Sequence, residues 1–228
     1  MTKEEKKKAE KKQAPKSDKK NGKDKKSMVE LVHWVAEQGI DGVPPLSSAK
    51  ALADEYEKTF PDKSADERID TLIRWESVKN FGTGFVTGLG GVLAMPVAIP
   101  SALAASWVVQ ARLAGAIAAT NGYDVHEPGV RALVMLCLLG DEASEVFANA
   151  RKVGATDFVS AAKKKVPAKV LMEINKQVGA RLVARTGVRG ALNILKVVPL
   201  AGGFLTGGFD AVTCRKIGNV ARKVFTAD

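Results

Sequence analysis

Cysteine, histidine and aromatic residues are all scarce in this chain of 228 residues. The two cysteines, Cys137 and Cys214, lie far apart without a CxxC spacing, which argues against a disulfide framework and against a zinc site. The two histidines, His33 and His126, belong to no HExxH pattern, and neither a GxSxG nucleophile motif nor the GK[ST] ending of a phosphate loop occurs. A reducing cytosol therefore suits the chain, and both histidines are expected to be structural or exposed.

Acidic residues are rare in the last third of the chain. Residues 151–228 carry 15 basic and 4 acidic side chains, whereas residues 27–150 carry 8 basic and 16 acidic ones. Residues 1–26 carry 12 lysines against five acidic side chains. The folded part is therefore expected to be dipolar, with a basic C-terminal third that suits an anionic partner.

This positive charge does not by itself indicate nucleic-acid recognition. No aromatic residue occurs between Phe158 and Phe204, where the basic residues are dense, so a platform for stacking bases is missing. No known DNA-reading module is present either. Nonspecific binding through the N-terminal lysines stays an alternative, and no specific nucleic acid is expected.

Beyond Met1, residues 1–27 contain no large apolar side chain. Folding them would bury too little surface to offset the lost backbone entropy. We therefore predict a disordered Lys-rich tail over residues 1–27, followed by one helical domain over residues 28–228. The tail would serve as a tether to an anionic surface or as a solubility tail. It contains no apolar core of a secretory signal, so export by the general pathway is not expected.

Apolar residues recur at helical spacing through most of the remaining chain, which predicts an all-α fold. Ser64 and Glu67 have the spacing of a capping box, and Pro128 suits the first turn of a helix. Glycines and prolines end several of the patterns. The helix after Ser64 is expected to bury one apolar stripe, which consists of Ile69, Leu72, Ile73 and Trp75. The predicted helices cover about residues 28–35, 48–60, 64–79, 131–139, 141–152, 168–186 and 210–225.

Charge is missing entirely from residues 81–110. Thirty uncharged residues are long enough to cross a membrane, but Pro96 and Pro100 disfavour one straight helix. The two arms around these prolines span roughly 22 to 27 Å each, which is short of a hydrocarbon thickness of about 30 Å. We therefore expect a helical hairpin, which either dips into one leaflet or forms the buried centre of the domain.

A second apolar segment, residues 197–209, echoes the first: GFLTG at 203–207 is nearly the GFVTG of 84–88. We interpret both as hairpins interrupted by glycine and proline, with chance similarity as the alternative. The side chains predicted to contact a membrane or a partner are Phe81, Phe85, Leu89, Pro96, Pro100, Trp107, Pro199, Phe204 and Phe209.

Asp210 is the acid with the most unusual surroundings, because thirteen uncharged residues precede it. A carboxylate there must meet a cation, become protonated or reach water, and Arg215 and Arg112 are its candidate partners. The default expectation is a capping or paired structural acid.

Other charged residues offer weaker candidates. Asp141 and Glu145, with Glu173, could place carboxylates together on helices, so a metal site built on carboxylates stays an alternative. No Glu-x-x-His pair supports it, so no catalytic residue, metal or cofactor is expected. Arg74 next to Trp75 fits either an interfacial anchor or a core tryptophan beside a snorkelling arginine.

Several stretches together resemble the bacterial EcsC protein family. LIRWESVKNFGTGFVTGLGGVLAMPVAIP, which begins at Leu72, is followed by ASWVVQARLAGAIA and LVMLCLLGD and looks like the central signature of that family. EINKQVGARLVARTG and VPLAGGFLTGGFDAVTCRKIGNVARKVF look like its C-terminal signature. The resemblance covers about residues 29–226. The family is named for a protein encoded beside the subunits of an ABC transporter, and no established reaction or cofactor attaches to it.

The resemblance implies bacterial origin and a membrane-linked role. We therefore expect a non-enzymatic cytoplasmic protein that is peripheral or monotopic at the inner membrane, as an accessory of a transport complex. Its expected partners are an anionic membrane surface or a membrane protein complex, with homo-oligomerisation left open. The alternatives are a nonspecific nucleic-acid-binding protein and a cryptic hydrolase or peptidase built on helical carboxylates.

Overall fold

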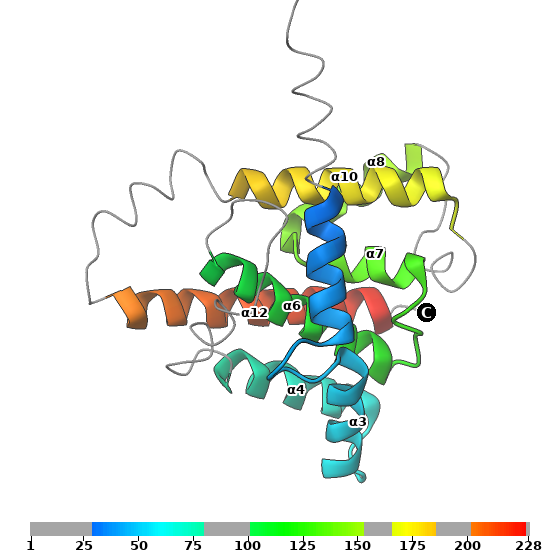
Figure 1. The fold of residues 1–228 in the computed structure, drawn as a ribbon. Coiled ribbons are helices and arrows are strands. Elements are labelled where there is room, and N and C mark those ends of the chain that lie inside the picture. Colours follow the sequence, from blue (N-terminus) through cyan, green and yellow to red (C-terminus); the bar gives the residue numbers. More distant parts are fainter. Residues whose placement is uncertain (1–28, 80–100, 153–165, 186–201, 227–228) are drawn as a thin grey trace, which may run out of the picture.

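The computed structural model describes residues 29–79, 101–152, 166–185 and 202–226, and helices joined by short connections make up these segments (Figure 1). No strand forms within them, and β pairing is limited to an isolated bridge between Val43 and Leu46. The prediction of an all-α fold is therefore confirmed. The predicted tail, the first arm of the first hairpin and residues 197–201 lie outside the described residues.

Three helical segments form the N-terminal third, as predicted. A helix over residues 29–36 continues as a π-helix, η1 (Glu37–Asp41), and α3 (Ala49–Thr59) and α4 (Ala65–Lys79) follow. Gly39 lets η1 lie directly against the later helix α6 (Ser101–Thr120), since a Cβ at this position would be 2.7 Å from the Ala111 Cβ.

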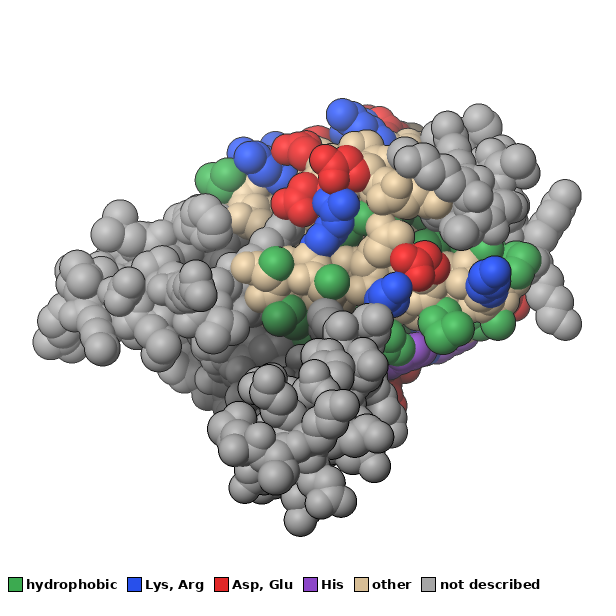
Figure 2. All heavy atoms as spheres, turned by 90° about the horizontal axis from the view of Figure 1, so that it is seen from above, with side chains coloured by type: hydrophobic (Ala, Val, Ile, Leu, Met, Phe, Trp, Pro, Cys, Tyr) green, Lys and Arg blue, Asp and Glu red, His purple; other side chains and the backbone are tan. Residues whose placement is uncertain are grey.

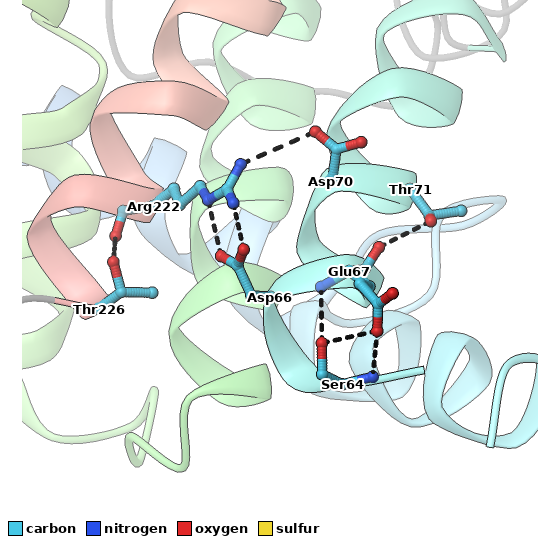
Figure 3. A network of polar contacts seen from close by, with 7 residues as sticks. All are labelled: Ser64, Asp66, Glu67, Asp70, Thr71, Arg222 and Thr226. Atoms are coloured by element: carbon cyan, nitrogen blue, oxygen red, sulfur yellow. Dashed lines mark hydrogen bonds and ion pairs between the residues drawn. The ribbon is translucent and has the colours of Figure 1, made fainter. Parts of the chain in front are cut away.

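The capping box predicted for α4 is present (Figure 3). The Ser64 N–H donates to the Glu67 carboxylate at 2.8 Å, and the Glu67 N–H donates to Ser64 Oγ at 3.3 Å. These hydrogen bonds satisfy backbone donors at the helix start that have no partner within the helix. The hydrogen bonds that the Glu67 carboxylate accepts from the Ser64 N–H and from the Ser64 hydroxyl favour its charged form and so lower the pKa of Glu67.

The buried face of α4 differs from the predicted stripe at one position. Ile69, Leu72 and Ile73 are buried as expected, but Trp75 is 50 % exposed, and the neighbouring Glu76 is buried instead. Position 76 follows Ile69 by two helical turns and returns to the same face, whereas position 75 lies roughly a third of a turn away. The inclusion of Trp75 in the stripe was therefore wrong.

Helix α6 is the central helix of the domain and contacts α3, α4, α7, α12 and η1. Its residues Leu103–Thr120 are long and apolar enough to cross a membrane, yet 83 % of them are buried inside the protein. A helix that is apolar on all sides is expected to be covered on all sides. The second arm of the predicted hairpin thus forms the buried centre of the domain.

The middle of the chain forms α7 (Pro128–Cys137), a short 3-10 helix η2 (Gly140–Glu142) and α8 (Ala143–Lys152). Pro128 occupies the first turn of α7, as predicted. Helix α10 (Ala168–Arg185) packs on α7 and α8. The apolar face predicted for it consists of Val170, Leu171, Ile174, Val178 and Leu182, and all of these are buried except Leu171, which is only partly buried.

The last helix, α12 (Gly202–Thr226), joins the apolar residues 202–209 and the basic residues after them into one element. It runs antiparallel to α4: Gly218 lies against Ile73, and Arg222 pairs with Asp66 and Asp70 near the start of α4 (Figure 3). The middle of α12 consequently lies beside the end of α4, and the start of α12 extends beyond it, at the end of the domain where α6 begins (Figure 1).

Candidate functional site

An ion pair lies in the core between α4 and α6. Arg112 Nη1 is 3.3 Å from Glu76 Oε2, and the two side chains are only 8 % and 5 % exposed. The same guanidinium donates through Nε to the Ser47 carbonyl at 2.6 Å and through Nη2 to Ser47 Oγ at 2.7 Å. The Tyr56 hydroxyl donates to Glu76 Oε1 at 3.2 Å. This network joins α4, α6, α3 and the loop before α3.

Burial dominates the electrostatics of this network. It lowers the pKa of Arg112, although Glu76 opposes that shift, and an arginine starts from a pKa above about 12, so the guanidinium stays charged. Burial first and the charge of Glu76 second raise the pKa of Tyr56, which keeps its proton and remains a donor. The groups therefore hold complementary charges in place, an arrangement suited to joining helices.

Glu76 was not predicted from the sequence, and Arg112 was expected to have a different partner. Arg112 was expected to be available to Asp210, whereas the structure pairs it with Glu76. The side chain of Asp210 lies outside the described residues, although its backbone belongs to α12. Glu76 could have been found from its spacing, because it continues the series Ile69, Leu72 and Ile73 on one face.

The remaining charged candidates do not gather at one site. Arg74 and Arg215 are exposed, and so is Asp141, which lies in η2. Glu173 accepts hydrogen bonds from Lys176 at 3.3 Å and from Gln177 at 3.0 Å on its own helix.

The carboxylates near η2 are paired with an arginine. Because residues 140–142 form a 3-10 helix, Asp141 and Glu145 do not share an α-helix as predicted. Glu142 and Glu145 instead pair with Arg181 of α10, at 3.4 and 2.9 Å. Acidic and basic side chains gather on this face of the protein (Figure 2). No cluster of three His, Cys, Asp or Glu residues suited to a metal occurs within the described segments.

Burial changes the reactivity of the Cys137 thiol. Burial raises its pKa to about 12. Because the thiolate is the nucleophilic form, this cysteine is unreactive at neutral pH.

Among the residues predicted to contact a membrane or a partner, only Trp107 has a side chain in the described part of the structure. It is only 5 % exposed, so this prediction was wrong for Trp107, which belongs to the core. Phe81, Phe85, Leu89, Pro96, Pro100 and Pro199 lie outside the described residues. The backbone of Phe204 and Phe209 belongs to α12, but the side chains of these two residues also lie outside the described part.

Exposed apolar side chains occur near the end of α4 and in the middle of α12. Trp75 and Val78 are 50 % and 63 % exposed on α4, and Val212 is 58 % exposed on α12. Because α12 runs antiparallel to α4 and Gly218 lies against Ile73, Val212 lies at the level of the last turns of α4. We call Trp75, Val78 and Val212 together the apolar end.

A cavity of about 470 Å³ opens next to Val212 between α6, η2 and α12. Its apolar walls include Leu103, Leu139 and Ile217, and Lys216 lies at its edge. Gln110 and Ser106, which are hydrogen-bonded to each other at 3.0 Å, supply polar groups. The apolar end therefore combines exposed apolar side chains with a recess.

Comparisons with protein-family models, with curated proteins and with solved structures give no match for this chain. The resemblance to the EcsC family thus stays a prediction. The geometry of the apolar end is the main structural indication of a function.

Proposed function

We propose that this chain is a non-enzymatic protein that docks on an anionic membrane surface through its apolar end. The observation that carries the proposal is the exposure of Trp75, Val78 and Val212 at one end of the domain, where α4 packs beside α12, a helix far away in the sequence. Isolated exposed apolar residues are common, but several at one end of a domain are typical of an interaction surface.

The neighbouring sequence supports a lipid partner. The uncharged segment 81–100 follows α4 directly, and the apolar residues 197–201 precede α12. Both connect to helices at the apolar end. Tryptophan beside arginine, as in Trp75 and Arg74, is common where a protein meets the interface between water and hydrocarbon.

Charge at the same end suits anionic headgroups. Arg74, Arg215 and Lys216 are exposed, and each basic side chain near an anionic bilayer contributes about 1 kcal/mol to binding. The basic N-terminal tail adds to this attraction. A role as an accessory of a membrane transport complex, which the EcsC resemblance implies, follows as an extension of this proposal.

Vesicle flotation with the full chain tests the proposal. We expect it to float with vesicles that contain phosphatidylglycerol and to float far less with neutral phosphatidylcholine vesicles. The double variant Val78→Glu/Val212→Glu should bind at least about tenfold more weakly, since burying one valine side chain contributes about 1.5 kcal/mol or more.

Met172→Glu is the matched control, because Met172 is equally exposed, at 61 %, on a different helix. It should float like the original chain. The proposal is rejected if the original chain does not float, or if both variants lose binding equally. Nucleic acid that remains bound after a high-salt wash would favour the nucleic-acid alternative.

A further inference from the structure

A second recess lies between the first helix, α7 and α10. This groove has a volume of about 510 Å³, which falls in the usual range of about 300 to 1,000 Å³ for small-molecule sites. Its apolar lining comes from all three helices, and residues 29–36, α7 and α10 are each described. The main apolar residues are Val32, Ala36, Ala132, Met135, Leu171 and Met172.

One side of the groove is polar. His33, His126 and Arg131 line it together with Asn175. Hydrophobic side chains and a histidine meet at one edge of the face shown in Figure 2. A recess with mostly apolar walls and a few converging polar groups is the usual form of a site for a small organic ligand.

Arg131 has donors that no described side chain uses. Its Nη2 contacts Asp41 Oδ1 at 2.6 Å and His126 Nδ1 at 3.3 Å. His126 Nδ1 also lies 3.4 Å from Asp41 Oδ1, so it accepts from Arg131 in one tautomer and donates to Asp41 in the other. Nε and Nη1 of Arg131 make no hydrogen bond to another described side chain. An arginine can hold a carboxylate through two nitrogens in this way.

We propose that this groove binds a small amphiphile that carries one carboxylate and an aliphatic body. The carboxylate accepts hydrogen bonds from Arg131 and from the two imidazoles, and the aliphatic body covers Val32, Met135 and Leu171. The partly exposed Met172 closes the lip, since a methionine side chain adapts its shape to an apolar ligand. Asp41 already neutralises the single positive charge of Arg131, so a ligand with one negative charge meets less repulsion from Asp41 than a doubly charged phosphate does.

Titration calorimetry of the full chain with sodium decanoate below its micelle concentration tests this site without vesicles. We expect saturable binding of one decanoate per chain and at least about tenfold weaker binding of 1-decanol, which lacks the charge. Arg131→Gln should lower the decanoate affinity at least about tenfold. Met172→Glu should do the same through repulsion and loss of apolar contact.

Val212→Glu is the control here, because Val212 lies at the apolar end and not in the groove; it should bind decanoate like the original chain. Met172→Glu keeps the test valid if Arg131→Gln does not fold, since Met172 is exposed. Absence of saturable binding, equal affinity for decanol, or unchanged affinity in Met172→Glu overturns the proposal. Failure of one proposal can be told from failure of the other, because Val212→Glu is expected to affect only membrane docking and Met172→Glu only decanoate binding.

Discussion

Helix α4 carries two ion-pair networks, one exposed near its start and one buried near its end. Near the start, Asp66 accepts two hydrogen bonds from Arg222, and their side chains are 59 % and 34 % exposed. Near the end, Glu76 pairs with Arg112, and both are almost fully buried. The exposed pair has the better bidentate geometry, yet water screens it, whereas removal of one buried partner would leave an uncompensated charge in the core.

The largest expected effect comes from breaking the buried pair. Arg112→Met should lower the free energy of unfolding by about 3 to 5 kcal/mol, because Glu76 and Ser47 lose the guanidinium that they share in the core. Urea unfolding followed by circular dichroism measures this. The double variant Glu76→Leu/Arg112→Met should be more stable than Arg112→Met, and a double variant as unstable as the single one would contradict the account of a broken ion pair.

A smaller effect is expected at Tyr56, which donates to Glu76. Tyr56→Phe removes a hydrogen bond to a charged acceptor and should cost about 1.5 to 3 kcal/mol. The pKa of Tyr56 is raised in the folded protein, whereas an unfolded tyrosine has a pKa of about 10. Stability from this difference is present below about pH 10 and is lost as the pH rises above it.

This dependence can be isolated by comparing unfolding at pH 8 and pH 11. The original chain should lose more stability over that interval than Tyr56→Phe does. Equal losses would show that Tyr56 is not the group responsible.

The capping box of α4 should contribute less. Ser64→Ala removes the acceptor of the Glu67 N–H and should lower the free energy of unfolding by about 1 kcal/mol. Ser64→Asp should retain most of the stability, because aspartate also caps helices, and thermal melts of both variants provide the comparison. Equal losses in the two variants would contradict a capping role.

The smallest effect is expected for the exposed network. Arg222→Gln should change stability by at most about 1 kcal/mol, and the difference should shrink in high salt. Urea titrations at low and high salt measure it. A loss of stability as large as that of Arg112→Met would contradict the expected difference between the exposed and the buried network.

Local features of the fold were predictable because their causes are local. Ser64 and Glu67 lie three residues apart, and Pro128 needs only its own ring geometry to begin a helix. The buried face of α10 repeats every three to four residues, so its residues were also identified correctly. None of these predictions depended on what packs against the helix.

Predictions that required knowledge of a neighbouring helix were less successful. Trp75 is apolar and lies near a buried stripe, but none of the helices in the described segments covers its side of α4. Glu76 is charged, yet it is buried because Arg112 and Tyr56 meet it there. Trp107 belongs to a helix that is apolar on all sides, and only its position at the centre of the domain decides that it faces the core.

The amino-acid sequence alone determined the helical fold class and most helix boundaries, because spacing, caps and prolines act within a few residues. Tertiary packing decided which charges are paired, which aromatic side chain is exposed, and that the end of α4 lies beside the middle of α12. These outcomes depend on contacts between residues far apart in the chain, such as Glu76 with Arg112 and Ile73 with Gly218. A partner across such a distance leaves no mark on the local pattern.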